Sequence, residues 1–211
     1  MANVLEASGE YAAMNDWLAR RLRGFGPLGI LAILIILAGN YVIAPLSAIL
    51  ALIWAKISRT PWRDIGYVRP RSWIRTIAIG IVLGVTLKLV MKALVMPLLG
   101  ASPINWAYHF VTGNPAVIPW MLYAIIVTAG FGEETFYRGW MFERLGKLFG
   151  QRAMAKTAIV LITSLLFASV HYTEQGIPGV EQAFVTGLVF GSIFAVAGQI
   201  FLLMIAHAAF D

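Results

Sequence analysis

The residues best suited to chemistry lie in one stretch, residues 130–139, which reads Gly-Phe-Gly-Glu-Glu-Thr-Phe-Tyr-Arg-Gly. Two adjacent carboxylates, Glu133 and Glu134, are followed by Arg138, and the stretch continues an apolar run that begins at Pro119. If this run crosses a bilayer, the carboxylates lie at its end or inside it. An ionisable group in hydrocarbon is costly, so it is either paired with a cation or used for chemistry.

Two histidines and an aspartate occur on later apolar runs. His171 ends one run, and His207 and Asp211 lie four residues apart on the last run, on one face of a helix. A turn at residues 148–153 would place Glu133 and His171 on neighbouring helices, roughly 25 and 28 Å from the turn at ~1.5 Å per residue. We therefore expect Glu133, His171 and His207 to meet at similar heights.

These residue types allow more than one chemistry. A carboxylate with imidazole partners can hold and deprotonate a water molecule, and a second imidazole can polarise a substrate carbonyl. Arg138 can keep one carboxylate of the pair ionised. Glu133, His171 and His207 are also plausible ligands for a divalent metal such as zinc, although the His-Glu-x-x-His pattern of zinc proteases is absent.

A purely structural explanation also exists, in which Glu133 or Glu134 forms a buried ion-pair network with Arg138 and the histidines that only fastens helices together. So many buried titratable groups are expensive to keep for packing alone, which favours a functional site.

The composition indicates a membrane protein. Of the 211 residues, 60% are hydrophobic and 12% are charged, which is about half the charge of an ordinary soluble domain. Apolar runs near 20 residues recur, so we expect an all-α, polytopic transmembrane helical bundle with about six spans, in contact with membrane lipids. The net charge of +6 does not call for nucleic acid, because the basic residues cluster between apolar runs. The absence of cysteine excludes disulfides and thiolate sites.

The chain divides into three regions by composition. Residues 1–24 form a polar or amphipathic lead-in, residues 25–115 hold the N-terminal membrane spans, and residues 116–211 hold the ionisable residues of the expected site. We expect this last region to continue beyond Asp211. Residues 27–57 favour one tilted or kinked span, with a re-entrant hairpin as the alternative.

Small residues predict where the spans pack. Gly80 and Gly84 form a small-residue face on the span 73–99. Lys88 and Lys92 lie one turn apart inside the same span, and snorkelling to the surface is the favoured interpretation. A position facing the bundle interior, or one binding an anionic headgroup, remains the alternative.

The C-terminal region predicts four further helices. The expected segments are a turn-rich loop 100–118, one long helix over 116–147, a span 154–172, a loop 173–181, a span 182–198 and a helix 200–211. Gly187 and Gly191 offer a packing face on the span 182–198.

Three motifs in order resemble those of the CPBP intramembrane proteases, also called the Abi family, which include CAAX prenyl proteases and bacteriocin-processing enzymes. The motifs are Glu133-Glu134-Thr135-Phe136-Tyr137-Arg138, Phe167-Ala168-Ser169-Val170-His171 and His207-Ala208-Ala209-Phe210-Asp211. The resemblance covers residues ~116–211 and implies hydrolysis of a peptide bond in a membrane-associated or prenylated protein or peptide.

The resemblance also implies roles for individual residues. Glu133 would be the general base with His171 as its partner, and His207 and Asp211 would stabilise the oxyanion. The remaining two motif residues, Glu134 and Arg138, would order the site. Asp211 departs from the asparagine that is common in the third motif. An ionised aspartate would repel an oxyanion, so Asp211 must be protonated, paired with His207 or bound to a metal. Whether the water is bound to a metal or held by the Glu/His pair alone stays open.

Two other function classes compete with the protease. One is a catalytically silent membrane scaffold or bacteriocin self-immunity protein of the same fold, which the intact set Glu133, His171 and His207 disfavours. The other is a proton-coupled transporter, which the absence of inverted halves disfavours. For the protease, we expect a multi-pass location in a prokaryotic inner membrane.

Overall fold

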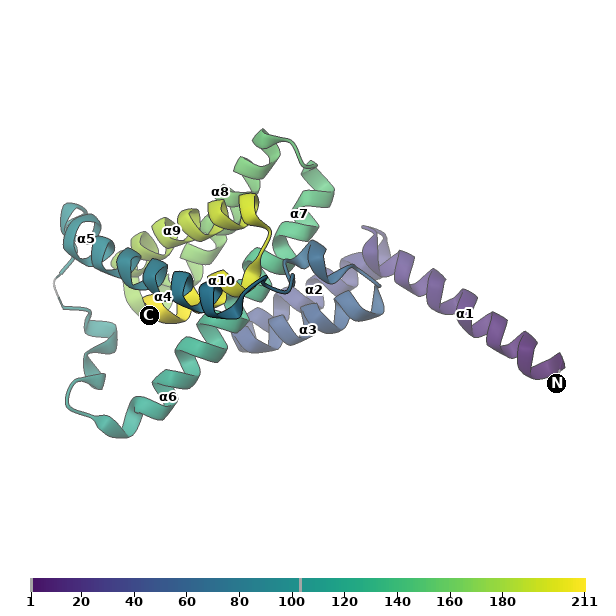
Figure 1. The fold of residues 1–211 in the computed structure, drawn as a ribbon, viewed down its shortest axis with the longest axis horizontal. Coiled ribbons are helices and arrows are strands. Elements are labelled where there is room, and N and C mark those ends of the chain that lie inside the picture. Colours follow the sequence, from purple (N-terminus) through teal and green to yellow (C-terminus); the bar gives the residue numbers. More distant parts are fainter. Residues whose placement is uncertain (1, 103) are drawn as a thin grey trace.

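A computed structural model describes residues 2–102 and 104–211, with side chains from residue 13 onwards except at residue 44. All elements in these ranges are helical, which confirms the all-α expectation (Figure 1). The elements are α1 (Ala2–Arg23), α2 (Pro27–Val42), α3 (Ala44–Ile57), η1 (Trp62–Ile65), α4 (Trp73–Val90), η2 (Met91–Val95), α5 (Met96–Leu98), η3 (Trp106–Val111), η4 (Pro115–Val117), α6 (Ile118–Tyr123), η5 (Ala124–Trp140), α7 (Met141–Phe149), α8 (Ala153–Val170), α9 (Tyr172–Ala197) and α10 (Ile200–Phe210).

The number of candidate membrane spans is smaller than expected. Four continuous helical stretches in the described residues are long and apolar enough to cross a membrane, namely Trp73–Leu98, Pro115–Phe149, Ala153–Val170 and Tyr172–Ala197. A fifth results if α1 and α2, bent by 62° between Arg23 and Pro27, count as one span. The expectation of about six spans is therefore too high, because α3 and α10 are apolar but short. The chain is a multi-pass membrane protein.

Residues 27–57 form a helical hairpin, so the single kinked span predicted there is wrong. The backbone is extended at Ile43, and Pro45 then opens α3, because proline has no N–H to continue a preceding helix but suits a first turn. The two helices run back along each other, with Gly39 of α2 against the backbone of Ser47. The far end of α3 returns to the start of α2.

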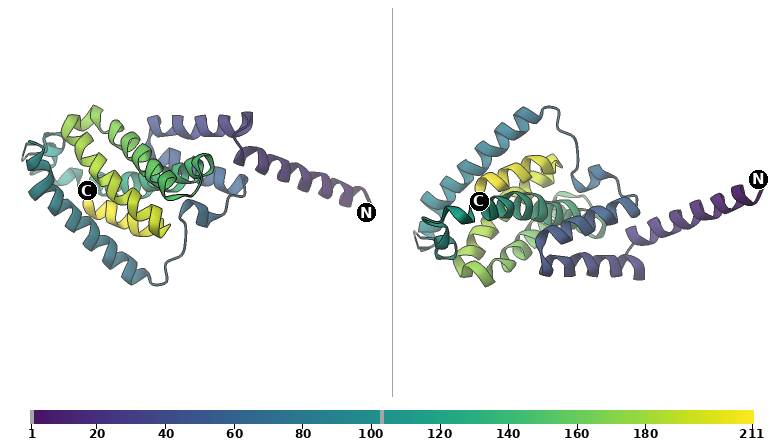
Figure 2. Two further views of the ribbon diagram at one scale, coloured as in Figure 1. Left: turned by 90° about the horizontal axis from the view of Figure 1, so that it is seen from above. Right: turned by 90° about the horizontal axis from the view of Figure 1, so that it is seen from below.

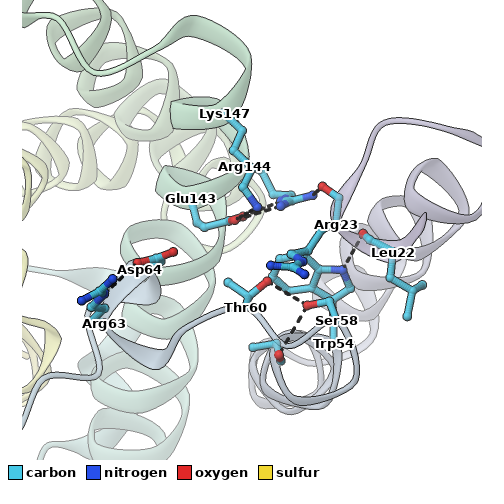
Figure 3. A network of polar contacts seen from close by, with 11 residues as sticks. Leu22, Arg23, Trp54, Ser58, Thr60, Arg63, Asp64, Glu143, Arg144 and Lys147 are labelled. Carbon is cyan, nitrogen blue, oxygen red and sulfur yellow. Dashed lines mark hydrogen bonds and ion pairs between the residues drawn. The ribbon is translucent and has the colours of Figure 1, made fainter. Parts of the chain in front are cut away.

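A charged network fastens this hairpin to the C-terminal half (Figure 3). Glu143 of α7 accepts hydrogen bonds from Arg144 at 2.5 and 2.9 Å and forms an ion pair with Lys147. Arg144 also donates to the carbonyl of Arg23 at 2.9 Å, and its guanidinium lies 4.3 Å from the Trp54 ring centroid. The polar lead-in thus forms helix α1. Its end at Arg23 is held by this contact, and the rest of α1 projects away from the other helices (Figure 2).

The long helix predicted over 116–147 is confirmed as a continuous stretch, Pro115–Phe149. Its centre, η5, is a π-helix of 17 residues, which the sequence did not indicate. Segments of π-helix are rare and often occur at functional sites.

The loop predicted at 173–181 is wrong, because α9 already begins at Tyr172. The helix absorbs a kink at Gly176, whose φ of 64° lies in the left-handed region, just before Pro178. The small-residue face predicted on this span is confirmed. A Cβ atom at Gly187 would lie 3.0 Å from the Ser164 Cβ of α8, so the two helices pack closely at that point.

Helix α10 packs closely between α4 and η5, because glycines on both of these helices allow backbone contact. A Cβ atom at Gly84 would overlap the carbonyl oxygen of Ala206, and one at Gly130 would lie 2.8 Å from the carbonyl oxygen of Met204. Ala206 is fully buried at this contact. The packing face predicted at Gly80 and Gly84 is therefore confirmed, and its partner is the helix that carries His207.

We predict that Gly84→Ala destabilises the protein by ~1–3 kcal/mol, because a backbone contact cannot yield to the added methyl group. Thermal unfolding in detergent measures the loss. Gly26→Ala is the control, since a Cβ atom there meets nothing within 4 Å. Equal unfolding temperatures for the two variants would contradict the close packing.

Candidate active site

A buried carboxylate, Glu134, joins two helices at the centre of the site. It is 0% exposed and pairs with Arg138 of the same helix, itself 2% exposed, at 2.8 Å. The same oxygen, Oε1, accepts a hydrogen bond from Nδ1 of His207 on α10 at 2.7 Å. Because an ionised carboxylate only accepts, Nδ1 of His207 carries a proton and Nε2 points the other way.

The Nε2 atom of His207 faces the two other carboxylates of the predicted site. It lies 3.6 Å from Oε2 of Glu133 and 3.7 Å from Oδ2 of Asp211. The side chains of Glu133 and Asp211 are 16% and 31% exposed, whereas that of His207 is 4% exposed. Glu134 therefore holds the imidazole at Nδ1, and the two partly exposed carboxylates of Glu133 and Asp211 lie near Nε2.

His171 approaches the same group from the end of α8. Its Nδ1 donates to the carbonyl oxygen of Phe167 at 2.8 Å, since a carbonyl only accepts, and this leaves Nε2 as the nitrogen that can take a proton. The ring of Phe167 contacts both histidines, with ring centroids 4.7 Å from His171 and 5.8 Å from His207. Glu133 interacts electrostatically with both imidazoles. The structure thus brings Glu133, His171 and His207 together.

Aromatic rings surround the buried cation. The guanidinium of Arg138 lies 4.7 Å from the Phe167 ring centroid and 5.7 Å from that of Phe190. Phe167 also contacts the ring of Tyr137, at 5.1 Å. These rings exclude water from the ion pair, and electrostatic interactions are stronger in such a low-dielectric environment.

The side chains of the described residues do not form a metal site as they lie. No group of three or more histidine, aspartate and glutamate side chains in this part of the chain has the arrangement of metal ligands. The set Glu133, His171 and His207, which the sequence suggested for a divalent metal, is included in that finding. No step of the chemistry is therefore derived through a metal.

Tyr108 of η3, in the loop before the helix that carries Glu133, contacts α9 near the site. Burial raises the pKa of Tyr108 to about 12, so its phenol stays protonated at neutral pH. The carboxylates of Asp211, Glu174 and Glu133 shift this pKa in the same direction, although Tyr108 remains 39% exposed to solvent. Gln175 of α9 donates to the phenol oxygen at 3.1 Å. In the sequence this tyrosine sits in a loop without charged residues, and nothing there indicated a role.

The N-terminal half supplies further polar contacts to η5 that the sequence did not indicate. The hydroxyls of Tyr67 and Thr135 share a hydrogen bond of 2.8 Å. Burial raises the pKa of Tyr67 to about 12, with the bond to Thr135 acting in the opposite direction. Asn40 of α2 donates to the Tyr137 hydroxyl at 3.4 Å. Sequence position alone gave no signal for these pairs, since their members lie far apart in the chain.

Comparison with known proteins supports the resemblance seen in the three motifs. Residues 115–211 match the family model described as "Type II CAAX prenyl endopeptidase Rce1-like". The match begins with the long helix that carries Glu133 and ends at Asp211. No curated protein and no solved structure matches the chain.

We predict that Arg138→Met destabilises the fold by ~3–5 kcal/mol, because it leaves the buried Glu134 carboxylate without its cation. Thermal unfolding in detergent measures this loss. Arg63→Met is the matched control, since the Arg63–Asp64 pair is exposed and its loss costs less than ~1 kcal/mol. An unfolding temperature for Arg138→Met equal to that of the control would mean that Glu134 is not ionised.

Proposed function

We propose that this chain, in which residues 115–211 belong to the Rce1-like family, is an intramembrane endopeptidase of the CAAX type. Its proposed substrate is a prenylated or otherwise membrane-associated protein or peptide, and its proposed location is a prokaryotic inner membrane. The observation that carries the proposal is the position of Glu133, whose carboxylate lies 3.6 Å from Nε2 of His207 and interacts with His171.

In the first step, Glu133 takes one proton from a water molecule, while Nε2 of His171 accepts a hydrogen bond from the remaining O–H and orients the oxygen. The water oxygen attacks the scissile carbonyl carbon, and the carbonyl oxygen becomes an oxyanion. His207, fixed by Glu134, donates from Nε2 to that oxyanion in its doubly protonated form. Glu133 then returns the proton to the leaving amine as the C–N bond breaks.

The surroundings of the site support a substrate held in the membrane. Glu133 lies on a helix that is long and apolar enough to span the bilayer. The family description names a CAAX prenyl endopeptidase, which supports a substrate that carries an isoprenoid. Such a lipid would hold the peptide close to Glu133 and reduce the entropy lost on binding.

We predict that Glu133→Gln and His171→Ala each lower cleavage of a farnesylated Cys-a-a-X peptide by ~10²–10⁴-fold, since the first removes the general base and the second removes the group that orients the water. Product release in detergent or vesicles is followed by mass spectrometry. His109→Ala is the control, because this histidine lies in the loop element η3 and packs against Trp106, with ring centroids 5.1 Å apart.

Cleavage that persists in both Glu133→Gln and His171→Ala would reject the catalytic assignment. If the wild-type protein cleaves neither the farnesylated peptide nor its unprenylated form, the silent scaffold becomes the better explanation. Cleavage of both forms at equal rates would keep the endopeptidase but reject prenyl specificity.

We further propose that Glu133 and His171 hold the water without a metal, in keeping with the lack of a metal-ligand arrangement in the described residues. Cleavage of the same peptide should therefore persist after dialysis against EDTA and in the presence of 1,10-phenanthroline. A loss of activity that added zinc restores would assign the water to a metal instead.

A further inference from the structure

A cation from the N-terminal half points toward the third motif. Lys88 of α4 is half-buried, and its Nζ lies 4.5 Å from the ring centroid of Phe210. Snorkelling was the favoured expectation for both lysines of this span, but the Lys88 ammonium is instead directed at the end of α10. Lys92, one turn further on, is exposed.

The packing of α4 on α10 explains why Lys88 reaches this position. The two helices run in parallel, with Trp73 beside Phe201 at 5.1 Å near their starts. Gly84 then lies against the backbone of Ala206, so the helices are in close contact there. One turn beyond Gly84, Lys88 is level with the end of α10, where Asp211 follows directly on Phe210.

The carboxylates of the site outnumber its cations, even when His207 is doubly protonated. Three carboxylates, those of Glu133, Glu134 and Asp211, gather around one imidazole. Arg138 is bound to Glu134. The ammonium of Lys88, which lies 4.5 Å from the ring centroid of Phe210, is close enough to the next residue, Asp211, for an electrostatic interaction without a direct ion pair. A lysine inside a membrane span is costly unless an opposite charge is close, so the two groups stabilise each other.

We propose that Lys88 is a positioning residue that offsets the charge of Asp211 and so permits an aspartate where asparagine is common in the third motif. This inference rests on the proposed function. An unpaired carboxylate beside His207 would oppose the developing oxyanion, whereas a carboxylate paired with an ammonium opposes it far less. The site then includes a residue outside the matched region 115–211.

The test is a double-mutant cycle on cleavage of the farnesylated peptide. Lys88→Met is expected to lower kcat at least about tenfold, because it exposes the oxyanion to the full charge of Asp211. Lys88→Arg, which keeps the charge, should stay within about threefold of wild type. In the Asp211→Asn background, Lys88→Met should change kcat less than about twofold. Lys92→Met is the matched control and should leave cleavage unchanged.

An equal loss from Lys88→Met in the two backgrounds would overturn the proposal and leave Lys88 with a packing role. Thermal unfolding of the same variants separates this outcome from failure of the proposed function, because it requires no activity. If the wild type does not cleave the peptide, the proposed interaction still makes a prediction. Lys88→Met should lower the unfolding temperature of the protein that retains Asp211, but not that of the Asp211→Asn variant. The absence of coupling in that measurement would overturn the pairing as well.

Discussion

The structure depends on one buried carboxylate. Glu134 accepts hydrogen bonds from Arg138 on its own helix and from His207 on α10 through a single oxygen, at 2.8 and 2.7 Å. An ionised carboxylate with no exposure to solvent needs a cation, so Arg138 must be present for Glu134 to remain charged. Only a charged Glu134 can hold Nδ1 of His207 firmly and leave Nε2 directed at the reacting groups. The orientation of the His207 imidazole thus follows from the buried ion pair between Glu134 and Arg138.

The helix carrying His207 could not be held by that ion pair alone. Glycines of α4 and η5 let both helices approach the backbone of α10. A side chain at Gly84 would push α4 away from Ala206 of α10. This packing has a second consequence, because it brings Lys88 level with Asp211. The N-terminal half therefore does more than anchor the protein in the membrane. Through Tyr67 and Lys88 it contacts both helices that carry the carboxylates of the site.

Much of the fold could be predicted from local pattern. The long helix before Gly150 and the small-residue faces at Gly84 and Gly187 follow from apolar periodicity, which reports on helices directly. The errors have a common physical cause. At Pro45 the chain reverses, and at Gly176 it only kinks, although both positions read as breaks in the sequence. A break shows where hydrogen bonding is interrupted, but the packing partners decide the direction that the chain then takes.

The sequence by itself determined which residue types are available for chemistry, and their order in three motifs was enough to indicate the family. Spacing also placed His207 and Asp211 on one face, because helical geometry fixes the i, i+4 relation. Only the tertiary structure decided that Glu134, and not Glu133, is the buried partner of His207, since adjacent residues point to different sides of a helix. It also decided that Lys88 lies against Phe210, next to Asp211, because that contact depends on the register of two helices that are far apart in the chain.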